Sequence, residues 1–165
     1  MKNKINAVVR LHAVTLLVVF VSAGCASLRN ADSQTDHPKE RAAIERRLQE
    51  IIAAAESKDL ERLDSYHAYG PKFTKYSGTS AGRLDAIAGR KGEHDGLGAV
   101  KGLKMHAQEL KIDVFGNVGI ATFILDYNFD SGSETIYRKD RSTIVFIKEH
   151  ADWKIVHEHL TPVQP

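Results

Sequence analysis

The sequence predicts an α+β fold in which helices near the start of the domain pack on an antiparallel sheet formed by its last third. Two observations predict this arrangement. Apolar residues recur at helical spacing from Ile44 to Ala55. From Leu110 onward they alternate with polar residues or run together in segments that end at turns. We assign the domain to residues 37–165, after a leader of residues 1–24 and a tether of residues 25–36.

The leader has the composition of a secretory signal peptide. Met1–Arg10 contains three basic residues and no acidic one, and the apolar run Leu11–Val21 leads to the small residues Ser22–Gly24. The run is too short to span a bilayer, which needs about 20 apolar residues. The alternative, a buried core helix, would leave the basic residues of the lead-in without partners.

Cys25 is the only cysteine, so no intramolecular disulfide can form in the oxidising compartment that export implies. Because it directly follows Ala23 and Gly24, the segment resembles the lipobox of bacterial lipoproteins, where the cysteine is lipidated and becomes the N-terminus. Ser22 departs from the family pattern, which prefers leucine there. The alternative is a free thiol beside an ordinary cleavage site. The resemblance implies a lipid anchor in the bacterial cell envelope, and Ala26 is typical of sorting to the outer membrane, facing the periplasm.

Cleavage of the leader changes the charge balance. The whole chain is formally +2, but loss of Lys2, Lys4 and Arg10 reduces the basic residues from 23 to 20 against 21 acidic ones. The mature protein is therefore close to −1. Its charge gives no support to nucleic-acid binding.

Two helices are expected at the start of the domain. Asp36-His37-Pro38 supplies an Asx cap and a proline in the first turn of the first helix. The apolar face of that helix comprises Ile44, Leu48, Ile51, Ile52 and Ala55. Asp59 can cap a second, shorter helix, whose apolar face comprises Leu60, Leu63 and His67.

The middle of the chain is less regular. Gly70-Pro71 ends the second helix, Phe73–Tyr76 is a possible short strand, and Arg83–Gly89 has room for one or two helical turns. Five glycines fall within the 14 residues from 89 to 102, so no element is predicted there.

The last third has the period of β-strands. Four strands are expected at Leu110–Val114, Val118–Phe129, Thr135–Ile147 and Trp153–Leu160. Polar or glycine-containing turns separate them at residues 115–117, 130–133 and 150–152.

The element order and the ending Trp153-Lys154-Ile155-Val156-His157-Glu158-His159 resemble the nuclear transport factor 2-like superfamily, and within it the SnoaL-like proteins. The resemblance covers about Pro38 to Pro162, and the glycine-rich middle departs from it. It implies a cone in which a strongly bent sheet wraps around the long helix and leaves a pocket open at one end. It also implies a homodimer formed through the outer face of the sheet. Members include isomerases, cyclases, dehydratases and binding modules, so the fold does not determine the function.

Asp126 is the candidate catalytic residue. It interrupts an otherwise apolar strand, where a carboxylate is costly to bury unless it is paired or hydrogen-bonded. An apolar pocket would raise its pKa toward neutrality, as a general acid or base requires. The resemblance supports this, because ketosteroid isomerase, a member of the superfamily, uses pocket aspartates. The alternative is an ion pair with Arg138, Arg141 or a lysine on the sheet surface.

The other candidate pocket residues are His157, His159, Glu158, Tyr66 and Tyr76. The two histidines project to one face of their strand, a geometry that metal sites can use, but a third ligand is not fixed by the spacing. We therefore predict no metal and no cofactor, and expect these rings to be hydrogen-bonded in the sheet or at the dimer face. Glu158 points to the opposite face and could join Asp126.

The tyrosines lie where the second helix leads to the first strand, together with His67 and Tyr69. The resemblance places the mouth of a pocket there, and the alternative is ordinary packing. Gly96-x-Gly98 with Lys101 matches no nucleotide-binding motif and is interpreted as a loop over the pocket.

These observations favour non-catalytic binding of a small apolar molecule or of a protein partner. The alternative is an isomerase or lyase that uses Asp126 in proton transfer. Binding is favoured because only one acid or base stands out in the sequence.

Overall fold

The computed structural model describes residues 37–78 and 80–164. The predicted leader, Cys25 and the tether fall outside the described residues. The elements in order are α1 (Pro38–Ser57), α2 (Leu60–Ser65), β1 (Thr74–Tyr76), α3 (Ala86–Ala99), β2 (Lys101–Phe115), β3 (Val118–Ser131), β4 (Glu134–Glu149) and β5 (Asp152–Pro162). This is the predicted α+β order. Within these ranges, no helix is long and apolar enough to cross a membrane.

Helix α1 forms where the apolar spacing predicts it. It begins at Pro38, where the missing N–H has no intrahelical partner to lose, and ends at Ser57, followed by Lys58 in the left-handed conformation. Ile44 and Leu48 are buried, and the Ile44 side chain lies so close to Gly119 of β3 that a Cβ there would clash with it. The predicted cap, Asp36, lies outside the described residues.

Helix α2 is capped as predicted by Asp59, whose carboxylate accepts the backbone N–H of Arg62 at 3.1 Å. The helix ends at Ser65, so His67 does not continue its apolar face. Instead, the backbone on either side of His67 bonds to Ile155 of β5, with Ala68 donating to Ile155 at 2.8 Å and Ile155 donating to Tyr66 at 2.9 Å. This pairing fixes the position of the His67 side chain relative to the sheet.

The glycine-rich middle is a helix, which sequence reasoning did not predict. Asp85 caps α3 by accepting the Ala88 N–H at 2.9 Å, and the helix continues through residues 89, 92, 96 and 98 despite their glycines. Each interior glycine costs about 1 kcal/mol relative to alanine. Gly89 is buried, and a Cβ there would lie 2.9 Å from Phe73, so close packing explains one of these glycines.

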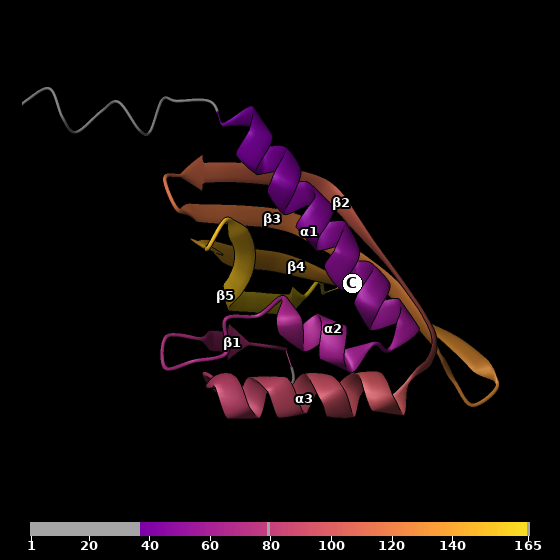
Figure 1. Ribbon diagram of the computed structural model, residues 1–165. Coiled ribbons are helices and arrows are strands. Elements are labelled where there is room, and N and C mark those ends of the chain that lie inside the picture. The colour runs from indigo at the N-terminus through magenta and orange to yellow at the C-terminus, as the bar shows by residue number, and fades with distance from the viewer. Residues whose placement is uncertain (1–36, 79, 165) are drawn as a thin grey trace, which may run out of the picture. The chain divides into compact units, whose positions relative to one another are not determined.

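The five strands form one curved sheet in the order β1-β5-β4-β3-β2 (Figure 1). The four long strands are antiparallel as predicted, whereas β1 joins β5 in parallel. β2 begins at Lys101, whereas the sequence predicted a strand only from Leu110. The prediction began too late because a bulge interrupts the alternation of apolar and polar residues: Glu109 is left-handed, and the register shifts between Gln108 and Lys111.

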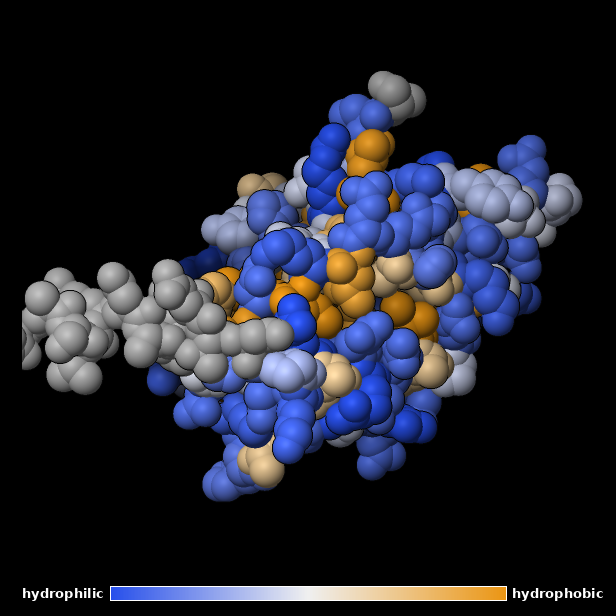
Figure 2. All heavy atoms as spheres, turned by 90° about the horizontal axis from the view of Figure 1, so that it is seen from above, coloured by the Kyte–Doolittle hydropathy of each residue, from blue (hydrophilic) through white to orange (hydrophobic). Residues whose placement is uncertain are grey.

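The core lies between α1 and the inner face of the sheet. Its largest fully buried side chains are Phe73, Phe146, Ile44 and Ile155. Figure 1 shows α1 lying across the sheet, with α2 and α3 beside β1 and β5. From above, hydrophobic residues occupy the middle of the visible face and hydrophilic ones surround them (Figure 2). Glu158 lies on the inner face of β5, at the side of this core that is next to α3.

Candidate functional site

Asp126 lies on the face of β3 opposite to its buried neighbour Leu125. Its carboxylate lies 3.0 Å from the ammonium of Lys139 and accepts a hydrogen bond from the Gln108 amide at 3.2 Å. Its side chain is 27% exposed. This is the arrangement of the alternative interpretation, an ion pair with a lysine on the sheet surface.

His157 and His159 share the outer face of β5 with Tyr76 of β1. Nδ1 of His157 is 2.8 Å from the Thr74 hydroxyl, and Nε2 of His159 is 3.0 Å from the Thr161 hydroxyl. The Tyr76 ring lies 5.5 Å from the His159 ring. These contacts match the expectation that the histidines are hydrogen-bonded within the sheet.

Tyr66 is buried away from these residues. It packs with Ala54 and Leu63, its hydroxyl accepts a hydrogen bond from Arg62 at 2.7 Å, and the guanidinium of Arg47 lies 4.4 Å from its ring centre. These contacts are those of a packing residue at the α1–α2 junction.

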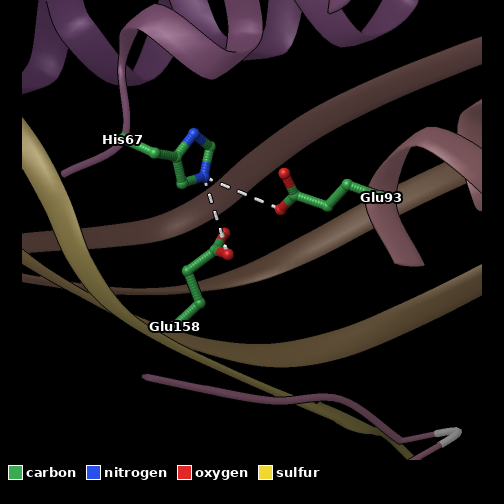
Figure 3. Close-up of side chains that lie close together, drawn as sticks. All are labelled: His67, Glu93 and Glu158. Carbon is green, nitrogen blue, oxygen red and sulfur yellow. Dashed lines mark ion pairs between the residues drawn. The ribbon is translucent and has the colours of Figure 1, made fainter. Parts of the chain in front are cut away.

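Of the site residues predicted from the sequence, Glu158 lies in a buried polar cluster. A bulge in β5 at Val156 turns Glu158 inward after Ile155, so the carboxylate and the two flanking histidines occupy opposite faces. It lies beside His67, from the segment after α2, and Glu93, from α3 (Figure 3). Nε2 of His67 is 3.7 Å from one oxygen of each carboxylate.

Lys75 of β1 and Tyr69 complete this buried cluster. The Lys75 ammonium lies 2.9 Å from Glu158 and pairs with Glu93 as well. The Tyr69 hydroxyl donates to the other oxygen of Glu93 at 2.8 Å, and the Tyr69 ring stacks on His67 with centres 4.7 Å apart. The parallel pairing of Lys75 with Glu158 in the sheet register places these two side chains on the same face.

The two carboxyl groups differ in their electrostatics. Burial and the charge of Glu158 raise the pKa of Glu93, outweighing the opposing effects of Lys75 and His67. Burial would also raise the pKa of Glu158, but the charges of Lys75 and His67 lower it well below its usual range. Burial acts to lower the pKa of Lys75, but the two carboxylates raise it, so the lysine carries its charge. Oppositely shifted carboxyl groups are common where proton transfer occurs, and also in structural ion-pair networks.

A pocket of about 510 Å³ adjoins this cluster at Tyr69. Its other lining residues come from one side of α3: Ala86, Ile87, Arg90, Lys91, His94 and Asp95. The charged groups of the lining are paired: Arg90 and His94 with Asp64, and Lys91 with Asp95. The pocket therefore offers apolar surface at Tyr69, Ala86 and Ile87, and no unpaired charge.

Sequence reasoning missed Glu93 and Lys75, and it placed His67 and Tyr69 near the expected mouth of a pocket without assigning them to a polar cluster. The signal for Glu93 was available, because Asp85 is a typical cap and Ala86, Glu93 and Leu97 recur at helical spacing behind it. The position of the Lys75 side chain could be inferred from the alternation of β1, because Lys75 and its neighbour in β5, Glu158, point to the same face of the sheet. That α3, β1 and β5 lie together does not follow from local sequence patterns and is known only from the tertiary structure.

Known proteins resemble the chain in sequence pattern and in fold. The model of the SnoaL-like domain matches residues 44–165. A candidate dehydratase of the nuclear transport factor 2-like (NTF2-like) family from Streptomyces avermitilis superposes with a TM-score of 0.70 at 14% identity, covering 77% of this chain and 98% of that one. A candidate calcium/calmodulin-dependent kinase II association domain from Exiguobacterium sibiricum gives 0.65 at 17% identity, covering 79% and 98%. An NTF2-like superfamily protein from Salmonella enterica also gives 0.65 at 17% identity, covering 77% and 93%.

No curated protein matches the sequence. At these identities the solved structures establish the fold, which is the helix-and-curved-sheet architecture expected from the sequence. The family match covers most of the chain and nearly all of the described residues. The chain therefore belongs to the SnoaL-like domain family.

Proposed function

We propose that this chain is a lipid-anchored envelope protein whose SnoaL-like domain binds a small, mostly apolar molecule without transforming it. The observation that carries this proposal is the pocket between Tyr69 and α3. Its volume of about 510 Å³ is within the range of small-molecule sites, about 300–1,000 Å³. Ile87 on its wall is 82% exposed, so a ligand would cover apolar surface that is otherwise in water.

The polar groups at this pocket are already engaged within the protein. The Tyr69 hydroxyl donates to Glu93, and the charged residues of α3 are paired with Asp64 and Asp95. An apolar ligand can therefore bind without breaking an ion pair, whereas a strongly charged ligand would have to displace one. This favours an apolar ligand and favours binding over chemistry.

A second candidate is a proton-transfer enzyme of the isomerase or lyase type. The buried carboxylates of Glu93 and Glu158, together with His67 and Lys75, favour this reaction class, and Tyr69 connects them to the pocket. Asp126, the acid or base proposed from the sequence, would have to act from the outer face of β3, where it pairs with Lys139.

One experiment distinguishes binding from turnover. The full chain in detergent is screened by thermal unfolding against small apolar acids, steroids and polyketide-like compounds, and each stabilising compound is recovered and analysed by mass spectrometry. A ligand at 100 times its dissociation constant adds about 2.7 kcal/mol of stability. Stabilisation with the compound recovered unchanged supports binding. Chemical conversion that is lost in Glu158→Gln supports the enzyme, and a flat panel contradicts both.

The lipid anchor is proposed from the leader and Cys25. Metabolic labelling of cells with an alkyne fatty acid should label the wild-type chain and not Cys25→Ser. Equal labelling of both proteins, or none of the wild type, would contradict the anchor. Separation of the inner and outer membranes then tests the location expected from Ala26.

We also propose that two copies pair through the outer face of the sheet. That face carries half-buried apolar residues on neighbouring strands, among them Ile120, Ile124 and Val145. One of the similar structures is named as an association domain, and that name is the support that this structure gives to the pairing of two copies. The occupant of the face is therefore proposed to be a second copy, and an unrelated protein partner is the alternative.

A further inference from the structure

We propose that His67, Glu93 and Glu158 form a binding site for a divalent transition-metal cation of the zinc or manganese class. One ligand atom from each residue lies within 4.8 Å of the other two. The three come from separate parts of the chain, namely the segment after α2, helix α3 and strand β5, and converge on one point (Figure 3).

The orientation of His67 is the observation that points to a ligand. Its Nδ1 lies 2.9 Å from the carbonyl oxygen of Leu63, and a carbonyl can only accept a hydrogen bond. In the neutral ring, Nδ1 therefore carries the proton, and the lone pair of Nε2 points toward the carboxylates. In the charged ring, Nε2 also carries a proton and forms ion pairs with both carboxylates, so this proton must leave before a metal ion binds. A metal-binding histidine is typically held in this way, with its other nitrogen donating to a carbonyl or carboxylate.

Nε2 of His67 has no hydrogen-bond partner among the residues that the structure describes. Its side chain is 1% exposed, so water does not readily supply one. The carboxylate oxygens at 3.7 Å are beyond hydrogen-bond distance but close enough to share a cation with the ring. A buried nitrogen that lies between two carboxylates without a hydrogen bond to either is unusual, and a metal ion would bridge the three groups.

The donor set selects the class of metal. One imidazole and two carboxylates suit Zn²⁺ or Mn²⁺, whereas Mg²⁺ and Ca²⁺ prefer oxygen ligands alone. Tyr69 supports the site from outside by donating to the second oxygen of Glu93 at 2.8 Å, which orients that carboxylate.

Lys75 is the competitor of the metal. Its ammonium contacts both carboxylates, and its positive charge favours their ionised forms inside the protein. An incoming cation must displace this ammonium from the carboxylate oxygens. Removing the lysine charge should therefore strengthen metal binding, an effect that a merely misfolded variant cannot produce.

The test is calorimetric titration of the full chain, purified in detergent without chelator, with Zn²⁺ and separately with Mn²⁺, followed by Co²⁺ absorption to report the ligand field. We expect one Zn²⁺ or Mn²⁺ per chain. His67→Phe, which keeps the ring stacked on Tyr69, should weaken binding by about tenfold or more. Lys75→Met should tighten it by about tenfold or more.

A double variant, His157→Ala with His159→Ala, controls for adventitious binding at the outer face of β5 and should leave the affinity unchanged. The proposal is overturned if neither metal binds the wild-type chain, if binding appears only in Lys75→Met, or if the double variant abolishes binding while His67→Phe does not. Thermal unfolding without metal verifies that each variant is folded.

Discussion

Glu158 and Asp126 are both carboxylates on long strands, and the face of the strand gives them different surroundings. Glu158 is buried beside Lys75 and His67, whereas Asp126 is part-exposed beside Lys139. Asp126 interrupts an apolar run and Glu158 lies between two histidines, so a two-residue period alone does not predict which of them faces the interior. The bulge at Val156 determines that Glu158, and not His157, faces the interior.

We predict that Glu158→Gln and Asp126→Asn have very different effects on stability. Removing the Glu158 charge takes away one of the two carboxylates that compensate the buried Lys75 and His67 and should lower the free energy of unfolding by about 3 kcal/mol. Asp126→Asn removes a part-exposed pair and should cost less than about 1 kcal/mol. Urea unfolding at pH 7 measures both. Similar losses of unfolding free energy for the two variants would contradict the prediction that the buried carboxylate contributes more to stability than the part-exposed one.

Glu40 is a second residue whose role depends on a distant partner. Its carboxylate accepts hydrogen bonds from the buried Trp153 indole at 3.1 Å and from the Lys148 ammonium at 2.9 Å. We predict that Glu40→Ala lowers the free energy of unfolding by about 1–3 kcal/mol, because the indole N–H loses its acceptor. Glu40→Gln keeps an acceptor and should have a smaller effect.

The pH dependence of this contact has a definite sign. The hydrogen bond from Lys148 outweighs burial and lowers the pKa of Glu40 below its ordinary value of 4.5. The contribution of the charged carboxylate is therefore complete above pH 4.5 and is lost as the pH falls through the lowered pKa in the folded state. The stability gap between wild type and Glu40→Gln should shrink when urea unfolding is repeated at more acidic pH, and a gap that widens would contradict this.

At the scale of elements, α3 shows how packing overrides local preference. Gly89 is buried against Phe73, while Gly92 and Gly96 have nothing within 4 Å of a Cβ built on them. The helix is therefore held by its cap and its inward face, including Glu93, rather than by the propensity of its residues. Its outward face lines the pocket.

We predict opposite effects for two glycine substitutions in this one helix. Gly92→Ala should stabilise the protein by up to about 1 kcal/mol, because alanine is the better helix former and meets no neighbour. Gly89→Ala should destabilise it by about 1–2 kcal/mol, because its Cβ would press on the fully buried ring of Phe73. Thermal unfolding of the two variants checks the signs, and stabilisation by Gly89→Ala would contradict the packing.

The elements also show how far the sequence could be interpreted. The apolar spacing of α1, the Asp59 cap and the three long strands from Val118 onward were predictable because each follows a local rule. β2 was placed too late because its bulge near Glu109 switches the inward positions from odd to even numbers. The buried cluster was only partly predictable, since Glu93 and His67 meet Glu158 through contacts between elements far apart in the sequence.

At the scale of the whole molecule, the outer face of the sheet is the surface proposed for pairing two copies. We predict that Val145→Lys converts a dimer into a monomer, because the charge would be buried without a partner in the centre of that face. Thr135→Lys, near the β3–β4 turn, is the control and should leave the dimer intact. Light scattering coupled to size exclusion measures the mass. A wild-type chain that is already monomeric would contradict the pairing.

The pocket at α3 is the feature on which the proposed function depends, and its location can be tested with two exposed apolar residues. Ile87 lines the pocket and is 82% exposed, whereas Tyr137 lies on β4, outside the pocket, and is 69% exposed. Replacing each with aspartate adds the same charge at an exposed apolar site. The two variants therefore differ mainly in whether the pocket is altered.

The most direct measurement is calorimetric titration of the strongest ligand from the thermal screen into wild type, Ile87→Asp and Tyr137→Asp. We predict that Ile87→Asp weakens binding by about tenfold or more, since covering an isoleucine side chain contributes about 1.5–3 kcal/mol and 1.4 kcal/mol corresponds to a factor of ten. Tyr137→Asp should bind like wild type. Equal affinity for all three proteins would show that the ligand does not occupy the α3 pocket and would contradict the proposed function.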